Sequence, residues 1–165
     1  MSQSQRPKPS LSPEKPSDSL RSRALRLLAR REHSRQELQR KLAPHAEDPH
    51  ALDRLLDELA TRGWLAEQRV AEQLIHARRR RFGSARIRQE LLAKGVAEEV
   101  VAAVLPQLKE SDLESARAVW RRKFRAPPAN RAERARQIRF MQGRGFAMDT
   151  ILQIFRSTGA DDENA

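Results

Sequence analysis

The chain of 165 residues contains no cysteine and no tyrosine, and only 4% of its residues are aromatic. Without cysteine it has neither disulfide bonds nor thiolate metal ligands, which fits a reducing compartment. No apolar run approaches the roughly 20 residues of a membrane-spanning helix, and the polar, proline-bearing N-terminus has no signal-peptide core. We therefore expect a soluble, cytoplasmic protein that does not enter membranes.

Residue groups that support catalysis are also missing. The four histidines lie in separate segments, and only His76 has an acidic residue, Glu72, one helical turn away. A metal site needs at least one more ligand in a defined geometry. The Gly-x-Gly at 143–145 lacks the flanking strand and the further glycine of a nucleotide-binding loop, and no serine has an organised base. We expect no catalytic residue, no cofactor and no metal.

What the chain does contain is a repeat. Three stretches carry apolar residues at i, i+3 and i+4 and a cation at i+7, namely Ala24–Arg31, Ala71–Arg78 and Ala116–Lys123. This spacing is one face of a helix. A second pattern, Arg-Gln-Glu-Leu-x-x-Lys, starts at Arg35 and again at Arg88, with a weaker copy over 140–144. Small helical units of this kind bury their apolar faces by stacking on neighbours, which predicts an elongated, curved array.

No segment alternates apolar and polar residues as a strand would, so the predicted fold class is all-α. We divide the chain into a disordered proline-rich tail at 1–18, three-helix modules at 19–65, 66–106 and 111–157, and an acidic frayed tail at 158–165. Nine helices in three tandem modules follow from this division.

Local signals set the expected helix ends. Ser17 or Ser19 can cap the first helix, and Ser34 with Glu37 forms a capping box at the start of the second. Further signals are Asp48 before Pro49 at the third helix, a helix from about 66 to 81, a helix over 97–105 that Pro106 ends, and a new capping box at Ser111-x-x-Glu114. Gly63 is the expected left-handed end of the third helix. Pro127-Pro128 ends the first helix of the third module.

Positive charge dominates the composition. The chain has 33 Lys and Arg against 22 Asp and Glu, a formal charge of +11. Between Arg117 and Arg144 we count ten cations and one anion, Glu133. A local excess of this size predicts a polyanionic partner, and such a field binds phosphate backbones without reading sequence.

The candidate contact residues come from this charge. In the run Arg78–Arg81, successive side chains circle a helix, so only one or two of them can face a partner. Arg86 and Arg88 open a predicted helix, where cations oppose the positive end of the dipole, and this broken rule indicates a function. The full candidate set is Arg78, Arg79, Arg86, Arg88, Lys94, Arg121, Arg122, Lys123, Arg125, Arg136, Arg139 and Arg144.

Three apolar residues follow a basic residue and a glycine, namely Trp64, Val96 and Phe146. After a left-handed glycine, the next apolar residue folds back on the last helical turn, so we expect all three to be structural. Stacking on nucleic-acid bases is the weaker alternative, because aromatic residues are so few.

Three segments resemble the RecX family of bacterial regulatory proteins, namely 23–34, 83–96 and 137–146, and the likeness extends from about Leu20 to Phe155. The resemblance implies three tandem three-helix modules and binding along the groove of the RecA filament on DNA. It also implies mainly inhibition of the recombinase, ATPase and coprotease activities of RecA, in recombination, DNA repair and the SOS response. The sequence departs from the family pattern at Ala66, Val70 and Ser84, where the family usually has an acidic residue, Phe and Pro.

On this interpretation the chain is a monomeric interaction protein without enzymatic activity, and its partners are the RecA filament and single- and double-stranded DNA. The alternative is an architectural protein that binds DNA without sequence preference as its primary target. An unrecognised enzyme is the least favoured of the three interpretations.

Overall fold

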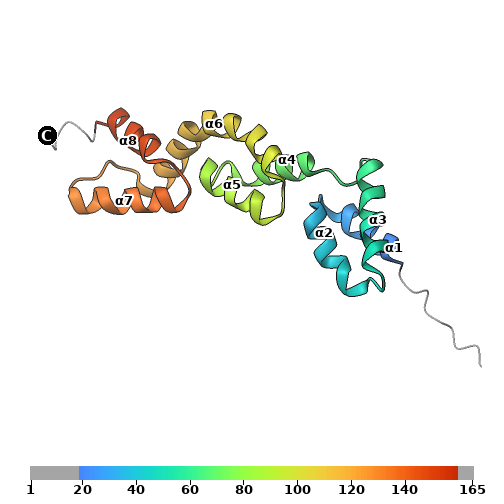
Figure 1. Ribbon diagram of the computed structural model, residues 1–165. Helices are drawn as coiled ribbons and strands as arrows, with labels where there is room; N and C mark the ends of the chain where they lie inside the picture. The colour runs from blue at the N-terminus through green and yellow to red at the C-terminus, as the bar shows by residue number, and fades with distance from the viewer. Residues whose placement is uncertain (1–18, 160–165) are drawn as a thin grey trace, which may run out of the picture.

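The computed structural model describes residues 19–159 and is an elongated row of helices (Figure 1). Within this range there is no β-strand, which confirms the all-α prediction. The proline-rich segment at 1–18 and residues 160–165 of the acidic tail lie outside the described residues. The elements are α1 (Leu20–Arg30), α2 (Arg35–Leu42), a 3₁₀ helix η1 (Ala43–His45), α3 (Pro49–Thr61), α4 (Glu67–Arg78), α5 (Ser84–Ala93), α6 (Glu98–Phe124), α7 (Arg131–Gly143) and α8 (Met148–Ser157).

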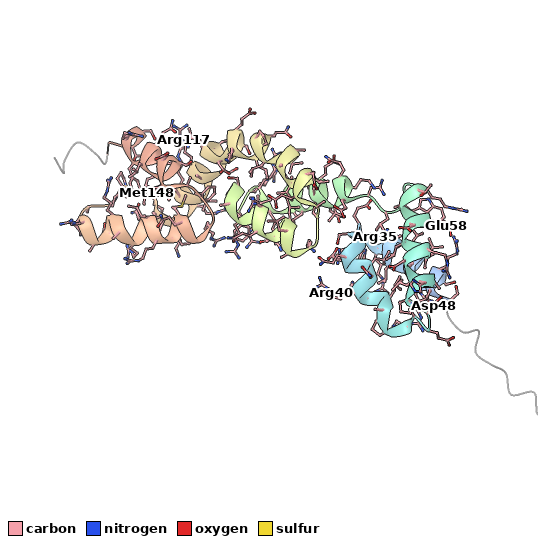
Figure 2. All side chains as sticks on the ribbon, viewed as in Figure 1. Arg35, Arg40, Asp48, Glu58, Arg117 and Met148 are labelled. Carbon is pink, nitrogen blue, oxygen red and sulfur yellow. The ribbon has the colours of Figure 1, made fainter. Side chains whose placement is uncertain are left out.

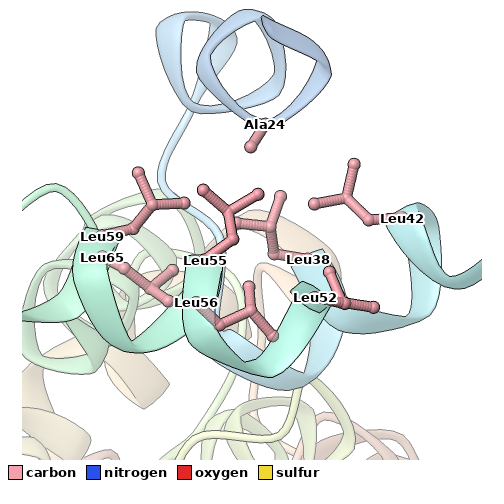
Figure 3. Close-up of a cluster of buried hydrophobic side chains, with 8 residues drawn as sticks. All are labelled: Ala24, Leu38, Leu42, Leu52, Leu55, Leu56, Leu59 and Leu65. Carbon is pink, nitrogen blue, oxygen red and sulfur yellow. The ribbon is translucent and has the colours of Figure 1, made fainter. Parts of the chain in front are cut away.

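Three separate hydrophobic cores divide the row into three modules. Module 1 comprises α1 to α3, module 2 comprises α4, α5 and the first half of α6, and module 3 comprises the second half of α6 with α7 and α8. Side chains cover the row from Arg40 on module 1 to Met148 on module 3 (Figure 2). The module 1 core is made almost entirely of leucine (Figure 3), and burying each such side chain stabilises the fold by about 1.5 to 3 kcal/mol.

The helix starts of module 1 follow the local signals. The Ser19 side chain caps α1, and Ser34 and Glu37 form the predicted capping box at α2. Asp48 caps α3 with Pro49 at its first position, where the missing backbone donor costs nothing. These predictions are confirmed. Each cap joins a side chain to a backbone N–H two or three residues further along, so the signal is local.

The predicted helix end at Pro106 is wrong. Helix α6 runs without interruption through Pro106 and Ser111, and the Ser111 hydroxyl donates to the Leu108 carbonyl 3.0 Å away instead of capping a new helix. Proline removes the hydrogen bond to the carbonyl four residues earlier, at Ala102. Both Pro106 and Ala102 are exposed, so that carbonyl is accessible to water. The penalty is small enough for the rest of the helix to continue.

The continuous α6 belongs to two modules at once, so the described chain has eight α-helices in place of the nine expected. Val101 and Leu108 lie in the core of module 2, and Ala116 and Trp120 lie in the core of module 3. Because burial on both sides of the proline anchors the helix, modules 2 and 3 are joined by a rigid rod.

Asp112, midway along α6, is a buried carboxylate that fixes the start of α5. It accepts from the Ser84 backbone N–H at 2.9 Å and from the Ser84 hydroxyl at 2.5 Å. Burial raises the pKa of Asp112, although both hydrogen bonds from Ser84 act in the opposite direction. The carboxylate also lies at the positive end of the α5 dipole. Asp112 therefore ties the middle helix of module 2 to the shared rod.

The middle helices α2, α5 and α7 meet head to tail, and the same contact forms twice. At junction 1–2 the Ser34 hydroxyl, at the N-cap of α2, donates to the Lys94 carbonyl at the C-cap of α5. At junction 2–3 the Gly83 N–H, at the N-cap of α5, donates to the Arg144 carbonyl at the C-cap of α7, 2.8 Å away. Each contact brings the negative end of one helix dipole to the positive end of the next.

A left-handed glycine follows the C-cap at both junctions, with φ of 78° at Gly95 and 90° at Gly145. A Cβ on Gly95 would overlap the side chain of Gln36, and a Cβ on Gly145 would lie 2.5 Å from that of Arg86. Glycine is therefore required there twice over, by its backbone conformation and by the closeness of the neighbouring module.

Junction 1–2 is closed by ion pairs around Glu37, whose side chain is only 12% exposed. Its carboxylate accepts from Arg31 at 3.1 Å and from the Lys94 ammonium at 3.2 Å. Burial alone would raise the pKa of Glu37, but hydrogen bonds from Arg31, the Ser34 N–H and Lys94 outweigh it, and the pKa falls to about 2. The ionised form of Glu37 is thus the one that holds the junction.

Because the pKa of Glu37 is lower in the folded chain than its ordinary 4.5, its stabilising effect is complete above pH 4.5 and is lost as the pH falls towards about 2. We expect Glu37→Gln to lower the free energy of unfolding by about 1 to 2 kcal/mol at pH 7. Urea titrations should show this deficit shrinking between pH 4.5 and pH 2. Glu110→Gln, at an exposed position of α6, is the control and should change little at any pH; a pH-independent deficit for Glu37→Gln would contradict this role of the ionised carboxylate.

Gly83 tests junction 2–3. A Cβ there would lie 2.7 Å from the Phe146 nitrogen and closer still to the Gly145 carbonyl, and these backbone atoms cannot move aside. We expect Gly83→Ala to lower the free energy of unfolding in urea by about 1 to 3 kcal/mol, as in other overpacked sites. Gly143→Ala is the matched control, because no atom lies within 4 Å of its Cβ, and it should be neutral or stabilise α7 by up to about 1 kcal/mol. Equal effects of the two substitutions would show that the junction is not close-packed.

Candidate nucleic-acid interface

The largest gathering of predicted contact residues lies along junction 2–3. Two adjoining hollows of about 370 and 410 Å³ lie there and share Arg122. We name their cations the junction strip, namely Arg79, Arg80, Arg81, Arg122, Lys123 and Arg144. One carboxylate, Glu114, also lines the larger hollow. The strip thus joins the turn after α4, the end of α6 and the end of α7 into one positively charged surface.

Helix α4 ends at Arg78, three residues earlier than the sequence predicts. Arg79, Arg80 and Arg81 lie in the turn that follows it and line the two hollows. The Arg80 carbonyl accepts from the Arg122 guanidinium at 3.4 Å, which holds this turn against α6. Arg80 and Arg81 are site residues that the sequence-based selection left out.

Aromatic rings lie beneath part of the strip. The Arg144 guanidinium carbon lies 5.2 Å from the ring centroid of Phe82 and 5.1 Å from that of Phe140, so it bridges modules 2 and 3. The Lys123 ammonium lies 5.6 Å from the Phe140 ring, which also meets Phe124 edge to face. Cation–π contacts of this kind hold cationic groups in place without neutralising their charge. The strip is therefore preorganised for an anion.

Two further candidates, Arg78 and Arg86, reach the same junction but contact the protein itself. Arg78 and Arg86 both pair with Glu90, at 2.9 and 3.6 Å. Arg86 also stacks on Phe82 at 4.3 Å and donates to the Gly143 carbonyl at 3.1 Å. These contacts offset the unfavourable position of Arg86 near the positive end of the α5 dipole. The presence of a cation there thus has a structural explanation.

The remaining candidates are spread over the row. Arg88 pairs with Glu98 at 2.6 Å within module 2, and Lys94 pairs with Glu37 at junction 1–2. Four others are exposed on module 3 but do not line the hollows of the strip, namely Arg121, Arg125, Arg136 and Arg139. Of the twelve predicted residues, the structure brings Arg79, Arg122, Lys123 and Arg144 together in the strip.

The prediction for residues after the capping glycines holds at two positions and is wrong at the third. Val96 and Phe146 are 3% exposed and belong to the cores of modules 2 and 3. Trp64 makes the expected backbone bond to Leu59, but its side chain is 43% exposed, and the next residue, Leu65, is buried instead. The Arg62 guanidinium lies over the Trp64 ring at 5.9 Å. The Trp64 side chain therefore lies at the surface, with Arg62 over its ring.

Metal ligands do not gather in the part of the chain that the structure describes. Within 19–159, no group of three His, Asp or Glu residues could hold a metal ion, and the Glu72–His76 pair stands without a third ligand. No helix in the same range is both long enough and apolar enough to cross a membrane.

The fold and the strip define a class: an all-α repeat protein of three three-helix modules with a basic surface across its second junction. Models of the RecX family match all three modules, the first three-helix domain at residues 21–59, the second at 67–105 and the third at 110–155. The chain belongs to the RecX family of regulatory proteins, which confirms the resemblance seen in the sequence.

Individual relatives agree. The regulatory protein RecX of Leptothrix cholodnii is 51% identical over 142 residues, 86% of this chain and 90% of that protein. RecX of Neisseria gonorrhoeae is 43% identical over 150 residues, 91% and 96% of the two chains. The crystal structure of RecX from Lactobacillus salivarius superposes with a TM-score of 0.75 at 15% identity and covers 87% of this chain and 96% of that one. At such low identity the structural likeness shows the fold alone.

Proposed function

We propose that this chain binds the RecA filament on DNA and mainly inhibits the recombinase, ATPase and coprotease activities of RecA. The observation that carries the proposal is the junction strip, which presents six cations on one surface of a chain that belongs to the RecX family. A filament on DNA exposes both protein and phosphates along its groove, and a row of modules has the shape to follow such a groove.

The strip supplies the contact with phosphates. Arg122 and Lys123 are exposed, and Arg144 is held between the two phenylalanine rings. Such groups attract a polyanion through charge and form charge-assisted hydrogen bonds with its oxygens, whatever the base sequence. Modules 1 and 3, held at fixed positions by the head-to-tail junctions, contact neighbouring RecA subunits, so one chain binds several sites at once.

In this proposal the chain works as a cytoplasmic monomer without a reaction of its own. Inhibition follows from occupancy: a rigid row that spans neighbouring subunits stabilises one spacing between them and opposes the changes that ATP hydrolysis and strand exchange require. Occupancy acts in this way wherever along the filament the chain binds.

The alternative function is architectural binding of DNA as the primary target. The same strip supports it, because a basic surface with phenylalanine rings beneath it is sufficient to bind nucleic acid without RecA. The two functions differ in what the rest of the row contributes. An architectural protein binds naked DNA as tightly as it binds the filament, whereas a RecA regulator binds the filament more tightly at the same salt concentration.

Removing two charges of the strip should weaken filament binding. We expect Arg122→Gln with Lys123→Gln to lower the affinity for RecA filaments on single-stranded DNA by about 1 to 3 kcal/mol, measured by fluorescence anisotropy. The plot of log affinity against log salt should become shallower by about 1.4 to 1.8, because two fewer phosphates are neutralised.

The matched control is Arg40→Gln with Arg156→Gln, which removes the same charge from exposed positions outside the strip, on α2 (Figure 2) and at the end of α8. It should bind nearly as the unaltered chain does. Equal losses in the two double variants would mean that overall charge, and not the strip, drives binding.

ATP hydrolysis by RecA on single-stranded DNA tests the inhibitory part of the proposal. We expect the unaltered chain and the Arg40→Gln, Arg156→Gln control to lower the hydrolysis rate at substoichiometric amounts. The strip variant should require a concentration higher by about 5- to 150-fold, in proportion to its weaker binding. An unchanged rate at saturating concentrations of the unaltered chain would favour the architectural function.

A further inference from the structure

A second basic hollow lies at the other end of the row, on module 1. It has a volume of about 330 Å³ and is formed by α1, the end of α2 and η1. Its lining consists of cationic or ionisable groups around two leucines, namely Arg23, Arg26, Leu27, Arg30, Lys41, Leu42 and His45. No acidic residue of the described chain lines it. The hollow thus combines a basic rim with an apolar floor.

Helical spacing explains the rim. Arg23, Arg26 and Arg30 are separated by three and four residues, so α1 presents them along one face, with Leu27 beside them. The facing helix α2 contributes Lys41 through its last turn. Arg30 and Lys41 are exposed, so both can contact a ligand directly.

The buried side chain of His33 contacts the Lys41 ammonium and holds it in position. Its ammonium lies 3.3 Å from Nε2 of His33, and Nδ1 of His33 lies 2.9 Å from the Arg31 carbonyl. Because an ammonium can only donate, Nε2 accepts and Nδ1 carries the proton. Burial, together with the nearby Arg31 and Lys41, lowers the pKa of His33 against the opposing hydrogen bond to the Arg31 carbonyl, so the neutral ring is retained.

The hollow also lies where the head-to-tail series stops. Lys41 occupies the position in the sequence repeat that Lys94 and Arg144 occupy in modules 2 and 3. Lys94 and Arg144 are C-caps whose carbonyls receive the N-cap of the preceding module, whereas Lys41 lies inside α2, whose C-cap is Ala43. In module 1 no left-handed glycine follows, and the chain continues into η1. Within residues 19–159 no module precedes this one, and no N-cap of another module meets the end of α2.

We propose that the module 1 hollow binds an acidic peptide segment of a partner protein. An apolar side chain of the segment rests on the half-buried Leu27, beside the core residue Leu42, and the flanking carboxylates pair with Arg30 and Lys41. Charge complementarity supports an anionic ligand, since the rim carries three arginines and a lysine and no acidic residue. No aromatic ring lines this hollow, in contrast to Phe140 in the junction strip, so unpaired bases have no stacking surface here.

The test uses the full chain and a fluorescein-labelled synthetic peptide with two central leucines flanked on each side by Asp and Glu. We expect saturable binding by fluorescence anisotropy. Arg30→Gln with Lys41→Gln should weaken it by about tenfold or more, because charge-assisted contacts are lost. Arg30→Lys, which keeps the charge, should weaken it less. The control pair Arg40→Gln and Arg156→Gln should bind the peptide as the unaltered chain does.

The leucines of the peptide test the apolar floor. A peptide with glycines in their place should bind at least about tenfold more weakly, because it leaves the exposed part of Leu27 uncovered. Equal binding of the two peptides would reduce the contact to charge alone and overturn the proposal. Far-UV circular dichroism of each variant confirms that helicity is kept.

A labelled thymidine 15-mer distinguishes the peptide from a nucleic acid as the ligand of the hollow. It should bind the Arg30, Lys41 variant almost as it binds the unaltered chain. Loss of oligonucleotide binding with intact peptide binding would identify the hollow as a nucleic-acid site. Neither RecA nor a strip residue enters the peptide test, so its outcome does not depend on the proposed function.

Discussion

Everything in this molecule depends on the contact between the N-cap of one middle helix and the C-cap carbonyl of the next. A three-helix unit with a core of about eight buried side chains is too small to be rigid by itself, and each module gains from its neighbour. The contact satisfies a backbone carbonyl that the helix end leaves without a partner and aligns the helix dipoles. It forms through a side chain at Ser34 and through a backbone N–H at Gly83, so the geometry recurs although the chemistry differs.

The junction strip is a consequence of that contact. Arg144 sits at the C-cap of α7 because its carbonyl receives Gly83, and this places its guanidinium between Phe82 of module 2 and Phe140 of module 3. The end of α6 brings Arg122 and Lys123 to the same place, since that helix runs through both modules. A basic surface assembled from three separate segments is therefore held by the hydrogen bond between Gly83 and Arg144, by that between Arg122 and the Arg80 carbonyl, and by one continuous helix. The composition gives only the net charge, and the fold determines where on the surface these cations lie.

Much of this architecture could be predicted from the sequence because it is encoded locally. The capping box at Ser34 and Glu37 and the apolar spacing within each module concern residues a few positions apart. The continuity of α6 could not, because Pro106 locally disfavours a helix and the compensating burial lies in two distant cores. The exposed ring of Trp64 and the buried carboxylate of Asp112 depend on tertiary packing in the same way.

For the same reason, only part of the junction strip was among the candidate residues chosen from the sequence. Composition located the excess of cations, but which of them share a surface depends on how the turn after α4 packs against the ends of α6 and α7. The most direct measurement of the central claim is hydrogen–deuterium exchange on the full chain with and without RecA filaments on single-stranded DNA. We predict that binding protects residues 79–82, 119–123 and 140–145 together. Protection that spares all three segments while other parts of the row are covered would contradict a role for the junction strip in filament binding.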